Sequence, residues 1–142
     1  MADTSEFAGQ VAVVTGAGRG IGFGIASTLA RRGASTVLVD VDQSVLDAAV
    51  ASLREAGLSA MGIVADVSSQ ASVSLMAEEA RGWKGRVEIV CANAAVFGSA
   101  SIADMTETEW DRLLSVNLKG AFFTLQAFLP AMLEQGYGRV VV

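Results

Sequence analysis

Residues 15–22 read T-G-A-G-R-G-I-G, and this glycine spacing is typical of a phosphate-binding turn. They follow the apolar run 11–14 and precede a helical pattern, so a strand is expected to pass into a helix here. Gly16 can adopt a tight turn, Gly20 lets amides approach an anion, and Gly22 permits close packing of the helix on the strand. Free amides and the positive end of the helix dipole favour a pyrophosphate at this point.

An ordinary glycine-rich connection is the alternative interpretation of this turn. Glycines in the spacing G-x-x-x-G-x-G directly after an apolar run favour nucleotide binding over that alternative. The candidate cofactor-binding residues of the turn are Gly16, Arg19, Gly20, Ile21 and Gly22.

Asp40 ends a second expected strand 18 residues after Gly22, about where an acidic residue binds the adenosine ribose in dinucleotide-binding folds. The alternative is a solvated acid that ends the strand, with Asp42 beside it as a helix cap. A carboxylate in this place repels a 2′-phosphate, so Asp40 favours NAD over NADP. Arg19 acts against this preference, because an arginine in the glycine turn could still hold a phosphate.

Three further polar residues follow strands or interrupt apolar stripes. Asp66, with Val67 after it, follows the third strand, and its carboxylate could accept from an adenine amine or cap a helix alongside Ser68. Asn93 follows the fourth strand in the stretch C-A-N-A-A. Asn117 interrupts an apolar helical stripe, where an unbonded amide would cost about 1 to 3 kcal/mol. Asn117 must therefore have partners, and a structural hydrogen bond to a strand carbonyl is one interpretation.

Together these motifs resemble the amino-terminal portion of the short-chain dehydrogenases and reductases, and the resemblance covers the whole chain. The matching motifs are T-G-x-x-x-G-x-G, the acid at Asp40, D-V at 66–67, V-N at 116–117 and G-R-V-V-V at 138–142. The match to the N-N-A-G motif of the family is partial, because Ala92 replaces its first asparagine and Ala95 its glycine.

The resemblance implies a role for each of these residues. Asp66 and Val67 would border the adenine, and Asn93 would steady the sheet edge beside the cofactor. Asn117 would be the helix asparagine of the catalytic tetrad, which positions a water in the proton relay. The implied reaction is hydride transfer between the nicotinamide of NAD and a small alcohol or carbonyl substrate.

The catalytic serine and the Tyr-x-x-x-Lys motif of the family have no counterpart in the 142 residues. Tyr137 lies ahead of the fifth strand and has no lysine four residues later. We therefore expect a single dinucleotide-binding domain over residues 1–142, incomplete at its carboxyl end and inactive by itself. The alternatives are a catalytically inactive dinucleotide-binding module and a nonfunctional fragment.

The composition excludes several other classes of function. A net charge of -5 without a basic stripe argues against nucleic-acid binding. The absence of histidine excludes a Ser-His-Asp triad, a histidine base and a histidine-containing zinc site, and no metal site is expected. Cys91, the single cysteine, is expected to be buried and inert. No apolar stretch has membrane-spanning length and the start is polar, so a cytoplasmic protein without membrane contact is expected.

Strand and helix patterns alternate along the chain, which predicts a doubly wound parallel sheet of the Rossmann-like type. The expected architecture has three layers, α/β/α, with strand order 3-2-1-4-5 and truncation after the fifth strand begins. The expected strands are 10–15, 36–40, 59–65, 87–92 and a fifth that starts at Arg139. Ile21, Ile25 and Leu29 form the expected inner stripe of the first helix. Gly82 and Gly85 are expected to break the third helix.

The longest expected helix covers residues 106–135 and starts with the capping-box sequence T-E-T-E. Its strongest apolar stripe includes Leu118 and Phe122, and its other side still carries Val116 and Phe123. A helix that is apolar on two sides must be covered on two sides, so a neighbouring subunit or a missing segment should pack there, and a homo-oligomer through this helix is expected. Pro130 is expected to kink its end or to start a further turn.

Overall fold

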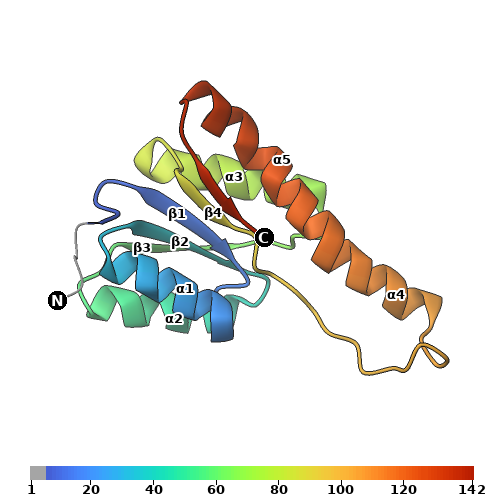
Figure 1. Ribbon diagram of the computed structural model, residues 1–142. Coiled ribbons are helices and arrows are strands. Elements are labelled where there is room, and N and C mark those ends of the chain that lie inside the picture. Colours follow the sequence, from blue (N-terminus) through green and yellow to red (C-terminus); the bar gives the residue numbers. More distant parts are fainter. Residues whose placement is uncertain (1–5) are drawn as a thin grey trace.

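Five parallel strands form the central layer of the protein in the computed structural model, which describes residues 6–142 (Figure 1). The strands are β1 (Val11–Thr15), β2 (Ser35–Asp40), β3 (Ala60–Val64), β4 (Ile89–Cys91) and β5 (Arg139–Val141). Their order is β3-β2-β1-β4-β5, and every neighbouring pair is parallel. The predicted doubly wound sheet and its strand order are therefore confirmed. The polar start considered above, residues 1–5, lies outside the described residues.

Helices cover both faces of this sheet (Figure 1). The helices are α1 (Gly20–Arg31), α2 (Gln43–Glu55), α3 (Gln70–Lys84), α4 (Glu107–Leu114) and α5 (Gly120–Glu134), with the π-helical turn η1 (Ser115–Lys119) between the last two. α1 and α2 pack on one face, whereas α3 and α5 pack on the other. α4, η1 and α5 follow one another directly and extend beyond the sheet at one end.

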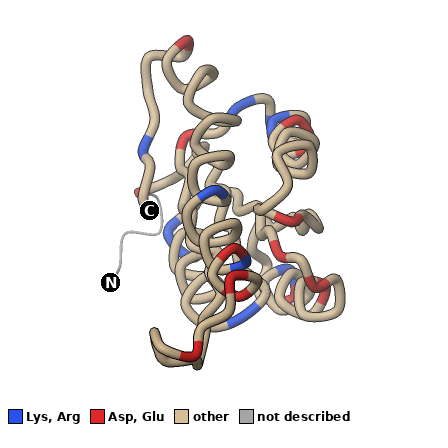
Figure 2. The backbone as a smooth tube through the Cα atoms, turned by 90° about the vertical axis from the view of Figure 1, so that its right-hand side faces the viewer, with Lys and Arg blue, Asp and Glu red and all other residues tan. Residues whose placement is uncertain are grey.

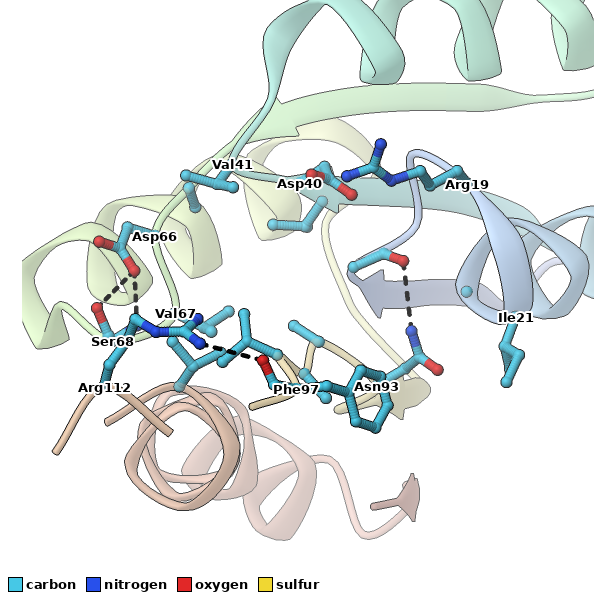
Figure 3. A pocket seen from close by; sticks show the side chains of 18 residues that line it. Arg19, Ile21, Asp40, Val41, Asp66, Val67, Ser68, Asn93, Phe97 and Arg112 are labelled. Carbon is cyan, nitrogen blue, oxygen red and sulfur yellow. Dashed lines mark hydrogen bonds between the residues drawn. The ribbon is translucent and has the colours of Figure 1, made fainter. Parts of the chain in front are cut away.

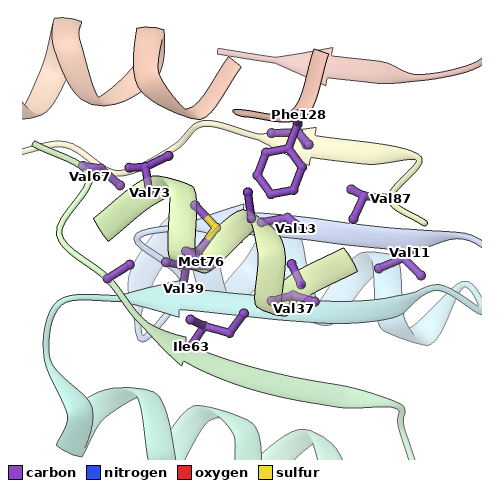
Figure 4. Close-up of a cluster of buried hydrophobic side chains, with 14 of the residues drawn as sticks. Val11, Val13, Val37, Val39, Ile63, Val67, Val73, Met76, Val87 and Phe128 are labelled. Carbon is purple, nitrogen blue, oxygen red and sulfur yellow. The ribbon is translucent and has the colours of Figure 1, made fainter. Parts of the chain in front are cut away.

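The strands are buried on both faces, which explains their nearly continuous apolar sequences. Val13 and Val37 point toward the α3 and α5 side, where Phe128 and Met76 complete the cluster (Figure 4). Alternate strand residues such as Val14 and Leu38 point toward α1 and α2. Cys91 belongs to this second cluster, and burial raises the pKa of its thiol, so little reactive thiolate forms.

The inner face of α1 agrees only in part with the sequence pattern. α1 buries Gly22, Ala26 and Ala30, whereas Ile21 is 79% exposed. Ile25 and Leu29 of the predicted stripe are half-buried and pack against the core, so the prediction was wrong only for Ile21. The small residues allow this helix to lie close to the sheet and leave its larger side chains at the edge of the contact. The predicted break at Gly82 was also wrong: α3 continues to Lys84 and ends at the left-handed Gly85.

The long helical stretch 107–134 faces the core with the side that the sequence pattern ranked second. Val116 and Phe123 pack against the core, while Leu118 and Phe122 on the predicted stripe are 64% and 57% exposed. Gly120 fixes this orientation, because a Cβ there would lie 2.7 Å from Cγ2 of Val67. The helix also continues through Pro130 as far as Glu134, so no separate turn starts at the proline.

Glu88 interrupts the apolar run of the fourth strand, which is shorter than predicted. Its side chain is 5% exposed and lies at the amino ends of the strands. Its Oε2 accepts a hydrogen bond of 2.7 Å from the Val11 amide, and its Oε1 pairs with the Arg86 guanidinium. The carboxylate thus satisfies a main-chain donor that would otherwise be buried without a partner.

Charged residues of both signs are interspersed along the helices and loops (Figure 2). Within residues 6–142, no helix combines the length and the apolar character needed to cross a membrane.

Candidate functional site

A cavity of about 620 Å³ lies at the carboxyl ends of β1 to β4 (Figure 3). Its size is within the usual range of small-molecule sites, about 300–1,000 Å³. β1 lies between β2 and β4, so the strand order reverses at this point, and ligands of open parallel sheets bind outside such a reversal. Of the predicted site residues, the cavity is lined by Gly16, Arg19, Ile21, Gly22, Asp40, Asp66, Val67 and Asn93. Gly20 and Asn117 are not among its lining residues.

The glycine turn has the backbone geometry that its sequence predicted. Gly16 and Gly20 have positive φ values of 65° and 58°, which favour glycine. A Cβ on Gly22 would overlap the Gly16 carbonyl oxygen and lie 2.6 Å from Nδ2 of Asn93. No side chain caps the amino terminus of α1, where Arg19 is the N-cap residue. The first amides of α1 are therefore available to an anion in the cavity.

Asp40 connects the end of β2 to the glycine turn. Its Oδ2 accepts a hydrogen bond of 2.9 Å from the Gly18 amide, and its Oδ1 accepts one of 3.2 Å from the Asp42 amide. Asp42 caps α2, and the Ser44 hydroxyl, with the amides of Val45 and Ser44, lowers the pKa of its carboxyl group. Asp40 and Asp42 thus have separate roles, and of the two only Asp40 lines the cavity.

Asp66 lies at the rim of the cavity in a tight turn before α3. Its Oδ1 accepts from the amide and the hydroxyl of Ser68, at 2.9 and 2.6 Å. The cap of α3 is Ser69, which accepts from the Ser72 amide. Val67 is buried between the cavity and Gly120. The contacts of Asp66 are therefore local, and its carboxylate remains at the rim of the cavity.

Asn93 joins the end of β4 to the glycine turn (Figure 3). Its Nδ2 donates to the carbonyl oxygens of Thr15 and Gly16, at 3.0 and 3.3 Å. The Ala94 amide donates to the Thr15 hydroxyl at 3.0 Å. These bonds fix the start of the segment after β4 beside the glycine turn.

Asn117 lies in the π-helical turn η1, and main-chain groups of a loop satisfy its side chain. Its Oδ1 accepts from the Val96 amide at 2.8 Å, and its Nδ2 donates to the Val96 carbonyl at 2.9 Å. Two details of the sequence argument were wrong: Asn117 is exposed rather than on the buried stripe, and its partner is not in a strand. Single π-helical turns inside α-helices are frequent at functional sites.

The sequence pattern missed several residues that line the cavity, namely Val41, Ala94, Phe97, Arg112 and Val116. Arg112 and Val116 are four residues apart on one helical stretch, so they lie on the same side of it. The spacing to Val116 could have indicated that Arg112 lies on the same helical side. No local pattern in the sequence indicated that the loop residues Ala94 and Phe97 line the cavity.

Comparison with known proteins agrees with this architecture. A profile of the family described as short chain dehydrogenase matches residues 10–142. The chain is 36% identical over 132 residues to 2-(S)-hydroxypropyl-CoM dehydrogenase 3 of Xanthobacter autotrophicus, covering 93% of this chain and 52% of that protein. It thus spans about half the length of the curated relatives that it matches.

Solved structures match at the level of the whole chain. A short chain dehydrogenase/reductase from Burkholderia phymatum in complex with NAD has a TM-score of 0.92 and 35% identity, covering 95% of this chain and 48% of that one. A metagenomic short-chain oxidoreductase in complex with NADP has a TM-score of 0.89 and 37% identity, covering 94% of this chain and 61% of that one. With the profile match over nearly all of its length, the chain belongs to the short-chain dehydrogenase/reductase family.

Proposed function

We propose that the chain is the cofactor-binding part of an NAD-dependent oxidoreductase that interconverts a small alcohol and a carbonyl compound. The observation that carries this proposal is the uncapped amino terminus of α1, which opens on the same cavity as Asp40. A dinucleotide needs an anion site and a ribose acceptor at this spacing. When bound, its nicotinamide ring supplies hydride transfer.

The adenosine half of the cofactor would lie along the ends of β2 and β3. The amides after Arg19 would bind the pyrophosphate, and the Asp40 carboxylate would accept from the ribose hydroxyls. Asp66 would accept from the adenine amine, with Val67 against the ring. The positions of these side chains around one cavity support this assignment.

The other half of the cofactor would lie beside the segment after β4. Ile21 is exposed at the cavity and offers an apolar contact to a ring. Asn93 holds this wall through its bonds to the glycine turn. For Asn117 we propose the role that the family resemblance implies, positioning a water for proton transfer in a complete active site.

The preference for NAD over NADP is part of the proposal and rests on Asp40. The structural neighbours include one protein bound to NAD and one bound to NADP, so family membership leaves the choice open. Asp40 lines the cavity with its carboxylate, and Arg19 is the opposing cation in the same wall. Since both oxygens of Asp40 accept main-chain hydrogen bonds, its charge is held in place against a 2′-phosphate.

Titration of the purified chain with NADH, followed by fluorescence or calorimetry, tests this function. We expect saturable binding in the micromolar range. No turnover of a panel of ketones and alcohols is expected, because the 142 residues hold no tyrosine with a lysine four residues later. Absence of binding at millimolar cofactor would contradict the proposal and leave a nonfunctional fragment, whereas turnover above background would contradict only the predicted inactivity.

We also propose that the chain pairs with a second copy through the helical stretch 107–134. Leu118 and Phe122 form an exposed apolar side there, while the opposite side packs on the core. Light scattering after size exclusion is expected to give a dimer, and Leu118→Glu is expected to give a monomer. Leu75→Glu is the matched control, because Leu75 is 67% exposed on α3. A monomer in the unaltered chain would contradict this pairing.

A further inference from the structure

Arg112, Val116 and Gly120 follow one another at intervals of four residues along one continuous helical stretch, so they share one side of it. This side faces Val67. A Cβ on Gly120 would lie 2.7 Å from Cγ2 of Val67, and Val116 packs against the cluster of buried residues that includes Val67. Arg112 lines the cavity, and Figure 3 shows it on the same side of the cavity as Val67.

Among the described residues 6–142, the guanidinium of Arg112 makes its polar contacts through one nitrogen. Nη2 donates to the Phe97 carbonyl oxygen at 3.1 Å (Figure 3), and the same atom lies 3.8 Å from Oε1 of Glu109. The side chain is half exposed. The planar group is thus held at one edge, and the rest of it is available to a ligand in the cavity.

Asp66 lies between Val41 and Arg112 along the cavity wall (Figure 3). Its Oδ1 accepts the two hydrogen bonds from Ser68, whereas its Oδ2 accepts none from the residues that the structure describes. Val41 directly follows Asp40, and its apolar side chain is 68% exposed. The cavity wall therefore offers an apolar contact, a free acceptor oxygen and a planar cation around one space.

These three groups fit a flat aromatic base that carries an amino group. The amine can donate to Oδ2 of Asp66, which directs the ring into the space between Val41 and Arg112. An apolar side chain packs on the face of such a ring, and a guanidinium plane stacks on it, as bases stack on arginine in nucleic-acid recognition. Adenine is a neutral ring with an amine, whereas oxidised nicotinamide is cationic and would be repelled by the guanidinium.

We propose that Arg112 binds the adenine base of the cofactor directly, with its guanidinium plane stacked on one face of the ring. This inference rests on the proposed function, in which the adenine lies beside Asp66 and Val67. The bond to Phe97 restrains the guanidinium before the cofactor binds, so little side-chain freedom is lost on binding. Loss of Arg112 should therefore weaken every ligand that carries the adenosine half, and by the same factor.

The test measures the Kd of NADH and of ADP by calorimetry for the 142-residue chain and three variants, at about 0.15 M salt, where exposed charges are screened beyond about 8 Å. Arg112→Ala is expected to raise both Kd values by the same factor, about five- to tenfold, as for the loss of one base stack. Arg112→Lys keeps the charge and a donor for the Phe97 carbonyl but has no planar group, so it should bind ADP at least about threefold more weakly than the unaltered chain. Arg81→Ala is the matched control, because Arg81 donates to the Ala127 carbonyl away from the cavity, and both Kd values should stay unchanged.

An unchanged Kd of ADP in Arg112→Ala would overturn the inference, and so would a rise confined to NADH, because Arg112 would then act on the other half of the cofactor. A lysine variant that binds ADP as tightly as the unaltered chain would also overturn it, since the charge or the bond to Phe97 would then suffice. Urea denaturation detects a loss of structure: weaker binding with a midpoint clearly below that of Arg81→Ala would mean that Arg112 supports the fold instead. In all these cases the proposed function stands, whereas absence of NADH binding in the unaltered chain would overturn both.

Discussion

Replacing Gly22 by alanine is expected to lower the free energy of unfolding by about 3 kcal/mol, the upper part of the range for overpacking, and to abolish cofactor binding. The added Cβ would overlap the Gly16 carbonyl oxygen and lie 2.8 Å from the Gly16 carbonyl carbon. It would also lie 2.6 Å from Nδ2 of Asn93. Main-chain atoms cannot give way as the end of a flexible side chain can, so the turn itself must move.

The atoms that Gly22 faces are held by the contacts that shape the site. Asn93 donates to the carbonyls of Thr15 and Gly16, and Gly16 already has a positive φ of 65°. Moving the turn away from a new methyl group breaks these bonds and displaces the first amides of α1. Stability and NADH affinity should therefore fall together.

Gly24→Ala is the matched control in the same helix. A Cβ at Gly24 has no atom within 4 Å, and the position lies inside α1. Alanine there is expected to stabilise the chain by about 0.5 to 1 kcal/mol and to leave NADH binding unchanged. Urea denaturation followed by circular dichroism measures both variants. A Gly22→Ala variant as stable as the Gly24→Ala variant would contradict the close packing described here.

The sequence predicted the strands and the sheet well because their signals are local. Buried parallel strands are apolar on both faces, so a run such as 11–14 can be recognised as a strand without knowing which strands lie beside it. Gly85, which has a positive φ, ends α3 as the pattern predicted. The strand order then followed from the alternation of strands and helices and from the family resemblance.

The orientation of two helices could not be predicted in the same way. Hydrophobic periodicity favours the stripe with the largest side chains, but α1 approaches the sheet through Gly22 and Ala26. α5 combines the small Gly120 with Phe128 and Met132 on its buried side. Close approach to the sheet needs small residues, and these carry little weight in a hydrophobic pattern. The large residues that remain outside, such as Phe122, then form the exposed apolar side.

Only those cavity residues that follow strand ends could be predicted from the sequence. The glycine turn and Asp40 follow strand ends, so their spacing identifies them. Arg112 bonds the Phe97 carbonyl, and Asn117 bonds Val96. Both contacts join a loop to a helix, and they depend on how that loop is placed beside the helix. The partner of Asn117 could not be identified from sequence either, although the need for one was inferred from the cost of an unpaired amide.

The second large effect concerns the choice between NAD and NADP, which Asp40→Asn should change. The variant keeps the size of the side chain but removes the charge and one acceptor oxygen. In the unaltered chain Asp40 accepts hydrogen bonds from the amides of Gly18 and Asp42 through separate oxygens. The variant therefore loses one of these bonds, and the ribose loses a charged acceptor. Loss of a hydrogen bond to a charged group costs about 1.5 to 3 kcal/mol, so the Kd of NAD should rise at least about tenfold.

NADP should respond in the opposite direction. Removing a negative charge about 5 Å from a 2′-phosphate relieves repulsion of roughly 3 kcal/mol at an effective dielectric of about 20, less what solvent screens. With Arg19 left as the dominant charge in this wall, the ratio of the two Kd values should shift toward NADP by about a hundredfold. Asp42→Asn removes the same charge outside the cavity and keeps a good helix cap, so its ratio should stay within about twofold of the unaltered chain. Equal shifts in both variants would mean that net charge sets the preference, and no shift in Asp40→Asn would remove Asp40 from the ribose site.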